Sequence, residues 1–483
     1  MDFSPMPDTL NGLPNFCGRE AEVEAVMSRT VPVFLPESNL RFDRLQAVAA
    51  VALHMHQPLI PAGSHDLRHA ETICNLEAML RGNEAHNVPV FLECYGRMGS
   101  ILPELVHQGK NPRIMLDYSG ELFYGLRRMG RMDIIDRLRH ITLDHHLRRY
   151  VEWLGTMWGH AVASSTPLPD LKLHMRAWQQ HFAALFGWDA LSRVQGFSPP
   201  EMHLPNHPDA AYTYVKTLLE CGYKWLLVQE HTVETLDGKS LDDRHVPHRL
   251  VAKNSSGEEV SILALIKTQG SDTKLVAQMQ PFYEAKGLQP RMINGIRVPP
   301  IVTQIGDGEN GGVMMNEFPG GYRQAVYQTG TEGVTLANGT EYLELLAAAG
   351  VRPEMLPACR PIHQGVLFAR IKKWEPGAAD KALEELRQEN PHFHLEGGSW
   401  TNNISWVRGY ESLLSEMEQL SVRFHQTLDN RPIDRNSHAY RNALFHLLVS
   451  QTSCFRYWGQ GIWPDYGREL CRRGREILEH DFR

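Results

Sequence analysis

The sequence predicts an α/β fold in which a parallel β-barrel precedes a mostly helical region. Up to about residue 361, short apolar runs alternate with stretches of helical spacing, which is the β–α–β rhythm of a parallel sheet. Beyond that point only amphipathic helical spacing remains. At 483 residues the chain is long enough for a barrel and an attached domain. We therefore expect an N-terminal extension over residues 1–44, a barrel over residues 45–360 and a helical domain over residues 361–483.

Six apolar runs are the candidate strands of the barrel. Each is followed by proline, glycine or a polar residue, which stops a strand and begins a loop. The runs cover the end of residues 45–56 and residues 113–120, 150–155, 194–198, 223–229 and 299–305. Segments of helical spacing lie between these runs and in the C-terminal region, at residues 68–82, 171–186, 210–221, 381–388, 410–428, 439–450 and 468–480.

Two segments fall outside this rhythm. Residues 1–44 are mixed in composition and hold five prolines, with a short helix expected near residues 19–28; we assign no function to them. Residues 250–266 contain two strand-like runs joined by Asn-Ser-Ser-Gly, which predicts a hairpin inserted before the strand at residues 299–305.

A glycine-rich loop with two carboxylates follows the last candidate strand. Asp307 and Glu309 stand among glycines, which allow backbone angles that other residues resist. Taken alone, Asp-Gly is also common in plain turns. Acidic loops at the carboxyl ends of buried strands are, however, where α/β barrels place their chemistry.

A second strand end presents a carboxylate on a stiff backbone. The run at residues 194–198 meets Pro199 and Pro200, which restrict the chain, and Glu201 follows. Two carboxylates on separate rigid strand ends are what glycoside cleavage needs, one as the nucleophile and one as the acid and base. The sequence thus pairs Glu201 with Asp307.

Two histidines, a further carboxylate and several aromatic side chains are candidate substrate ligands. His54 and His56 point to the same side of a strand, where they would hold a metal, bind a sugar or form a satisfied pair in the core. Glu152 lies between apolar neighbours, so it is either buried and paired or faces a cleft. Four aromatic side chains near the C-terminus would stack on glucose rings or seal the helical domain onto the barrel. These are Tyr457, Trp458, Trp463 and Tyr466.

Charge and composition exclude several classes of protein. The net charge of −7 argues against general binding to nucleic acid or to anionic membranes, which requires a basic surface. The sequence has no run of about 18 apolar residues and no signal-peptide pattern at its amino terminus. Its seven cysteines are scattered and form no Cys-x-x-Cys pair, which fits reduced thiols. We expect a cytoplasmic protein.

Four of these motifs, taken in order, resemble glycoside hydrolase family 57. They are His56-Gln57-Pro58, Val151-Glu152, Pro200-Glu201 and Asp307-Gly308-Glu309. The resemblance covers roughly residues 45–460 and includes residues 451–459, which are similar to a helix of that family. It implies an incomplete parallel (β/α)7 barrel followed by a mostly helical C-terminal region. It also implies activity on α-glucans with retention of the anomeric configuration.

The resemblance assigns roles to single residues. Glu201 would be the nucleophile and Asp307 the general acid and base, and retention requires their carboxyl groups to lie about 5–5.5 Å apart. Ser198 stands where the family often has tryptophan, and residues 313–319 also lack one, so the bond specificity stays open. The resemblance also makes His56, Glu152 and His160 residues that contact or support the sugar. Glu309 would either raise the pKa of Asp307 by like-charge repulsion or bind the sugar itself. Trp458 and Trp463 are candidates for stacking on the substrate because of the aromatic density there.

Three functions remain open on the sequence alone. The first is a retaining hydrolase or transglycosylase of the α-amylase or 4-α-glucanotransferase type, which acts on maltooligosaccharides without a metal or cofactor. The second is a metal-dependent deacetylase on a related barrel, in which His54 and His56 would activate water with an aspartate, although no third ligand stands at motif-like spacing. The third is a non-catalytic glucan-binding protein. The sequence does not predict the oligomeric state.

Overall fold

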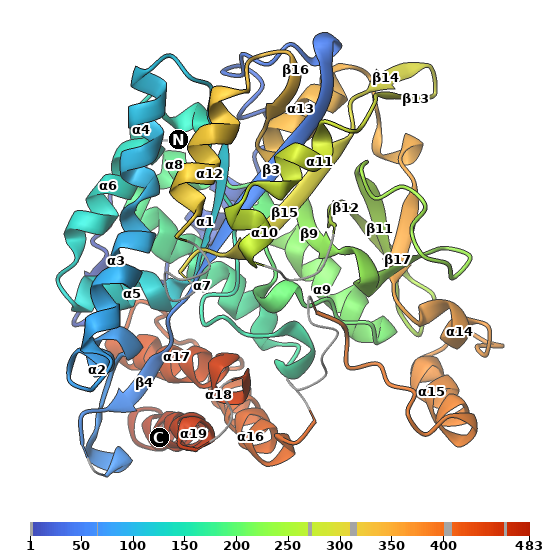
Figure 1. Ribbon diagram of the computed structural model, residues 1–483. Coiled ribbons are helices and arrows are strands. Elements are labelled where there is room, and N and C mark those ends of the chain that lie inside the picture. Colours follow the sequence, from blue (N-terminus) through green and yellow to red (C-terminus); the bar gives the residue numbers. More distant parts are fainter. Residues whose placement is uncertain (1–2, 65, 269–272, 310–315, 400–407, 458–460) are drawn as a thin grey trace.

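Parallel strands close into a barrel at the centre of the computed structural model (Figure 1), which describes all residues except 1–2, 65, 269–272, 310–315, 400–407 and 458–460. Neighbouring strands pair in parallel, and the last strand returns to the first through Asp307 opposite His54. In barrel order the strands are β3 (Leu45–Met55), β6 (Ile114–Tyr118), β7 (Val151–Trp153), β8 (Gly196–Phe197), β9 (Trp225–Gln229), β12 (Glu259–Lys267) and β15 (Ile301–Asp307).

Two pairs of neighbouring strands in the barrel are each joined by a single residue pair. A single bridge, Gly155 to Phe197, joins β7 to β8, and a single residue pair, Lys267 with Thr303, joins β12 to β15. Within the described residues this ring is the incomplete parallel barrel of seven strands that we expected, and the prediction is confirmed.

Side chains of β3 alternate between the inside and the outside of the barrel. Ala50 and Ala52 belong to the interior cluster, whereas Val51 and Leu53 pack into a second cluster with the surrounding helices. His54 continues the inward row at the carboxyl end of the strand, and His56 follows two positions later. The alternation therefore aims both histidines into the mouth of the barrel.

Helices cover the outside of the barrel (Figure 1). The principal ones between the strands are α3 (Val88–Gly96), α4 (Met98–His107), α5 (Gly120–Arg128), α6 (Met132–Leu143), α7 (Asp170–Phe186), α9 (Pro208–Glu220), α11 (Gln280–Ala285), α12 (Phe318–Tyr327) and α13 (Gly339–Ala348). The prediction of a helix at residues 68–82 is wrong for the first half of that range. That half forms β5 (Glu71–Cys74), which pairs with β4 (Leu59–Ala62), and α2 (Asn75–Leu80) follows. Thr72 and Ile73 are β-branched, which favours a strand, and they lie opposite Pro61 and Ile60 of β4.

The hairpin at residues 250–266 exists, but it is not an insertion. β11 (His248–Lys253) pairs antiparallel with β12, and β12 also pairs in parallel with β9 over five residues, from Leu263 to Lys267. The second strand of the hairpin is therefore a strand of the barrel. β11 extends the sheet outward to β17 (Ala358–Pro361) and β10 (Val233–Thr235).

Past Pro361 the described elements are helices, as the sequence predicts. In Figure 1, α16, α17, α18 and α19 lie together below the barrel, whereas α14 and α15 stand to one side. One hydrophobic cluster joins the lower helices to the barrel's outer layer, where the rings of Phe445 and Trp158 lie 6.0 Å apart. The helices are α14 (Gln364–Phe368), α15 (Ala378–Glu389), α16 (Glu411–Leu428), α17 (His438–Ser450), α18 (Cys454–Tyr457) and α19 (Trp463–Asp481).

The N-terminal segment packs on the barrel's helices through α1 (Glu20–Met27), close to the helix expected at residues 19–28. All seven cysteines are buried and unpaired. Among the described helices, we find none with both the length and the apolar character needed to cross a bilayer.

Candidate active site

Polar side chains from three adjacent strands meet at the carboxyl end of the barrel. In the strand register, His54 of β3 lies opposite Asp307 of β15 on one side and Asp117 of β6 on the other. The amide of Gly308 also donates to the carbonyl of His54, at 2.8 Å, and ties the start of the acidic loop to β3. The structure thus brings Asp307 next to the histidine pair.

A chain of buried hydrogen bonds runs through His54. Its Nδ1 lies 2.8 Å from Oδ2 of Asp117, and its Nε2 lies 2.8 Å from Nε2 of His160. The other ring nitrogen of His160 lies 2.7 Å from Oγ of Ser453, which follows α17 in the C-terminal region. Both ring nitrogens of His54 are therefore engaged in hydrogen bonds within the cluster. Among the described residues, no group of three or more His, Cys, Asp or Glu side chains is arranged to hold a metal ion.

His56 occupies the neighbouring position. Its ring stacks on that of His160, with centroids 4.0 Å apart, and its Nδ1 lies 2.7 Å from Oγ of Ser119. Its backbone amide donates to Oε1 of Glu309 at 2.9 Å. The structure accordingly brings together four of the residues that the sequence proposed: His56, His160, Asp307 and Glu309.

The electrostatics of this cluster centre on His54. Burial lowers the pKa of His54, but the carboxylates of Asp117, Asp307 and Glu309 outweigh burial and raise the pKa to about 10. Burial raises the pKa of Glu309 to about 8, against the opposing effect of the His54 cation. Burial likewise raises the pKa of Asp307, and the His54 cation opposes this. At each of these three groups, burial thus favours the neutral form and the neighbouring opposite charge favours the charged form.

Burial lowers the pKa values of His56 and His160, and the nearby His54 cation lowers them further. Both rings are therefore neutral near pH 7, each with one nitrogen that donates and one that accepts.

Glu201 lies on a strained turn after β8. Pro199 and Pro200 lead into it, and Glu201 and Met202 both adopt left-handed backbone angles, with φ of 60° and 50°. Such angles cost free energy for residues other than glycine, and they cluster at functional sites. The Glu201 side chain is partly exposed, whereas Pro200 and Met202 are buried.

Cys454, next to Ser453 in the chain, is a buried thiol. Burial raises the pKa of Cys454, and the charges of Glu121, Glu201 and Glu309 raise it further. His160 is similar to Glu201 in that its φ is also left-handed, at 50°.

Glu152 is placed inside the barrel, one inward-facing layer below His54. It lies opposite Met115, which pairs with Ala52, and it is 1% exposed. Its carboxylate accepts from the backbone amide of Thr340 at 3.0 Å and from the Thr340 hydroxyl. Glu152 thus caps the N-terminus of α13, and no described contact links it to the histidine cluster. The buried and paired alternative describes its placement.

The C-terminal aromatic residues are not gathered at the site by any described contact. Trp458 lies outside the described residues. Trp463 is partly buried at the start of α19, where it packs on the hydrophobic core with its ring 5.6 Å from that of Tyr466. This is the packing of a residue that seals the helical region.

Sequence reasoning missed several residues of the cluster. Asp117 and Ser119 lie at the end of a predicted strand, and that position was a usable signal. Ser453 and the neighbouring Thr452 carried no such signal, because their histidine partners lie hundreds of positions earlier in the chain. Lys267, at the end of β12, is 1% exposed, and burial lowers its pKa to about 8.

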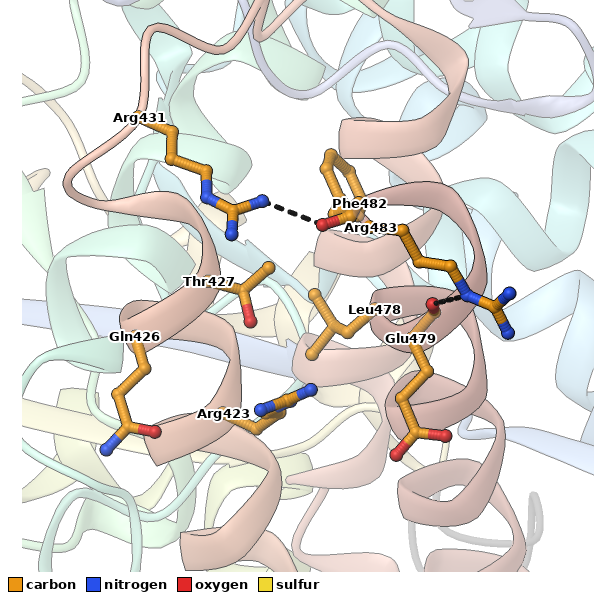
Figure 2. A pocket seen from close by; sticks show the side chains of 8 residues that line it. All are labelled: Arg423, Gln426, Thr427, Arg431, Leu478, Glu479, Phe482 and Arg483. Carbon is orange, nitrogen blue, oxygen red and sulfur yellow. Dashed lines mark hydrogen bonds between the residues drawn. The ribbon is translucent and has the colours of Figure 1, made fainter.

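A pocket between α16 and α19 differs from the cluster at the barrel mouth in the charges of its lining residues (Figure 2). It encloses about 470 Å³ and is lined by Arg423, Gln426, Thr427, Arg431, Leu478, Glu479, Phe482 and Arg483. Its three arginines are exposed, and Glu479 is the one carboxylate among the lining side chains. It lacks the pair of carboxyl groups that glycoside cleavage needs.

Known proteins share this architecture at low sequence identity. No protein-family model and no curated protein matches the chain. The 4-α-glucanotransferase from Thermococcus litoralis superposes with a TM-score of 0.55 at 14% identity, over 91% of this chain and 60% of that one. A GH57-type branching enzyme from Pyrococcus horikoshii superposes with a TM-score of 0.52 at 11% identity, over 90% of this chain and 89% of that one. The chain spans about 60% of the glucanotransferase, and it has the fold of both enzymes.

Proposed function

We propose that the chain is a retaining enzyme that acts on α-glucans, with Glu201 as the nucleophile and Asp307 as the general acid and base. The observation that carries this proposal is the meeting of Asp307 and Glu309 with three histidines at the barrel mouth, together with the strained turn that presents Glu201 after β8, at the same end of the barrel. The fold shared with a glucanotransferase and a branching enzyme supports it.

The first chemical step needs a protonated acid. Burial raises the pKa of Asp307, which favours the acid form. Asp307 protonates the glycosidic oxygen as the bond from that oxygen to C1 breaks, and the Glu201 carboxylate attacks C1 from the opposite side. The product is a covalent glycosyl-enzyme whose configuration at C1 is inverted.

The second step returns the enzyme to its starting state. Asp307, now ionised, takes a proton from water or from a sugar hydroxyl, whose oxygen attacks C1 and displaces Glu201. Two inversions give net retention. Water yields hydrolysis, and a sugar hydroxyl yields transfer.

Unpaired polar atoms in the site support a polyhydroxylated substrate. Oε2 of Glu309 and Oγ of Ser198 are buried and have no hydrogen-bond partner among the described residues. Buried polar atoms are rarely left without a partner, and sugar hydroxyls would supply one. Glu309 is therefore the first candidate for a sugar contact, with His56 beside it.

Incubation with maltooligosaccharides of defined length, followed by separation of the products, tests this proposal. Shorter sugars alone would indicate hydrolysis, longer ones as well would indicate transfer, and branched ones would indicate a branching enzyme. Binding without any new product would favour the non-catalytic glucan-binding alternative and contradict the proposal.

A further inference from the structure

A short segment of the C-terminal region pairs with the residues that directly follow the Glu201 turn. We call residues 396–399 the strap; it lies between α15 and α16 in the chain. The amide of Leu204 donates to the carbonyl of Gly398 at 2.9 Å, and the amide of Gly398 donates back to Leu204 at 3.2 Å. Two side chains hold it further: Oδ1 of Asn206 accepts from the amide of Gly397 at 2.7 Å, and Nε2 of His231 lies 2.6 Å from the carbonyl oxygen of Ser399.

His203 links the strap to a third part of the barrel mouth. Its Nε2 lies 3.1 Å from the carbonyl oxygen of Glu396 and 3.0 Å from Oγ of Ser164, which lies in the loop after β7. The His203 ring is 1% exposed. The residue two positions after Glu201 is therefore fixed between the C-terminal region and the barrel.

Contact between the strap and His203 is close enough to require glycine. Gly397 has φ of 87°, and a Cβ atom there would lie 2.2 Å from Cε1 of His203 and 2.7 Å from the carbonyl oxygen of Leu204. A real Cβ essentially never approaches other atoms so closely. Any side chain at this position would push His203 or Leu204 away.

The turn beneath the strap needs external support. Glu201 and Met202 are consecutive residues in left-handed conformations, which persist only where the surroundings over-determine them. Within the turn, the amide of Met202 donates to Pro199 and that of His203 donates to Pro200. The Met202 side chain packs in the interior cluster of the barrel, and hydrogen bonds with the strap and with Ser164 hold His203 and Leu204, which follow it.

We propose that the strap is a positioning element of the active site, which holds the Glu201 turn in its strained conformation through His203 and Leu204. This inference rests on the proposed role of Glu201 as the nucleophile. The strap touches neither substrate nor reacting atoms; it acts through the turn. The C-terminal region then contributes to turnover in addition to packing on the barrel.

Gly397→Ala tests the proposal, with Gly377→Ala as the matched control. Gly377 has a similar φ of 80°, and a Cβ there would meet nothing within 4 Å. We expect Gly397→Ala to lower kcat on maltooligosaccharides by about 10²-fold, because displacements near 1 Å have effects of that size. We expect KM to stay within about twofold, because ground-state contacts remain. Gly377→Ala should change neither constant by more than about twofold.

Hydrogen exchange provides a readout that does not depend on activity. In Gly397→Ala, the peptide covering residues 198–206 should exchange about tenfold faster than in the unmodified protein, because its amides lose protection locally. Equal exchange of this peptide in all three proteins would overturn the proposal, whether or not the protein acts on glucans. Faster exchange together with an unmodified protein that makes no product would leave the strap's role intact and reject the proposed function.

A second pair of variants covers the case in which Gly397→Ala fails to fold. His203→Ala removes the ring that lies against the strap, and His203→Gln restores an amide donor near Glu396. Faster exchange of residues 198–206 in His203→Ala, reduced again in His203→Gln, would support the proposal. Indistinguishable exchange in the two variants would contradict it.

Discussion

The Nε2 atoms of His54 and His160 lie 2.8 Å apart, so one of the two rings donates a proton and the other accepts it. Asp117 faces the opposite nitrogen of His54, which favours the doubly protonated imidazolium there. His54 then donates at both ends, and neutral His160 accepts at Nε2 and donates from Nδ1 to Ser453. The result is a fixed cation next to Asp307 and Glu309.

Removing this cation should shift the pH dependence of catalysis. The positive charge of His54 lowers the pKa of Asp307, so its loss in His54→Gln raises that pKa. A higher pKa keeps the acid protonated to higher pH. We expect the alkaline limb of the kcat/KM profile to move to higher pH in the variant. An alkaline limb that stays in place or moves to lower pH would contradict this reading.

The same cation should make stability depend on pH. The pKa of His54 is about 10 in the folded protein, above its ordinary value of 6.5. Its protonation therefore stabilises the fold fully below about pH 6.5, and that contribution is lost as the pH rises through about 10. We expect Tm to fall over this window, and to fall less in His54→Gln and in Asp117→Asn. Parallel Tm curves for all three proteins would exclude the charged pair as the cause.

Substitution of Glu152 distinguishes a structural role of this residue from a role in substrate binding. Glu152→Ala leaves the amide and hydroxyl of Thr340 without their acceptor inside the barrel. We expect a loss of about 1–3 kcal/mol in the free energy of unfolding, which is typical of buried groups left unpaired. The KM for maltooligosaccharides should change by no more than about threefold. A large increase in KM at unchanged stability would instead establish Glu152 as a sugar contact.

The effect of substituting Asp307 should depend on the leaving group of the substrate. Asp307→Asn should lower the rate on maltooligosaccharides by about 10²–10⁴-fold, the usual contribution of acid and base catalysis. A nitrophenyl glycoside needs no proton on its leaving group, so bond cleavage should be slowed much less with that substrate. Comparable losses on both substrates, measured as single-turnover rates, would argue against Asp307 as the acid.

The sequence predicted the parts of this molecule that local pattern determines. Alternation along the first predicted strand placed His54 and His56 on one side, and proline or glycine marked the strand ends at Glu201 and Asp307. Contacts between segments that lie far apart in the sequence could not be predicted from such local patterns. The turn at residues 254–257 correctly predicted the hairpin of β11 and β12. The parallel pairing of β12 with β9 could not be predicted in this way, because it forms only when the barrel closes.

Contacts across the longest sequence separations were the least predictable. Ser453 reaches His160 across 293 positions, and the strap reaches His203 across 193. No spacing rule connects such residues, because their proximity is a product of how the C-terminal region docks. Glu152 was ambiguous for a related reason, since its partner Thr340 lies 188 positions away.

Covalent trapping tests the central claim, that Glu201 is the nucleophile, most directly. A 5-fluoro-α-glucosyl fluoride forms the glycosyl-enzyme and slows its breakdown, so that the modified peptide can be sequenced by mass spectrometry. The account predicts one attached sugar on the peptide that contains Glu201, and no label in Glu201→Gln. A label on any other carboxylate, or turnover of α-glucans with inversion and no label at all, would contradict it.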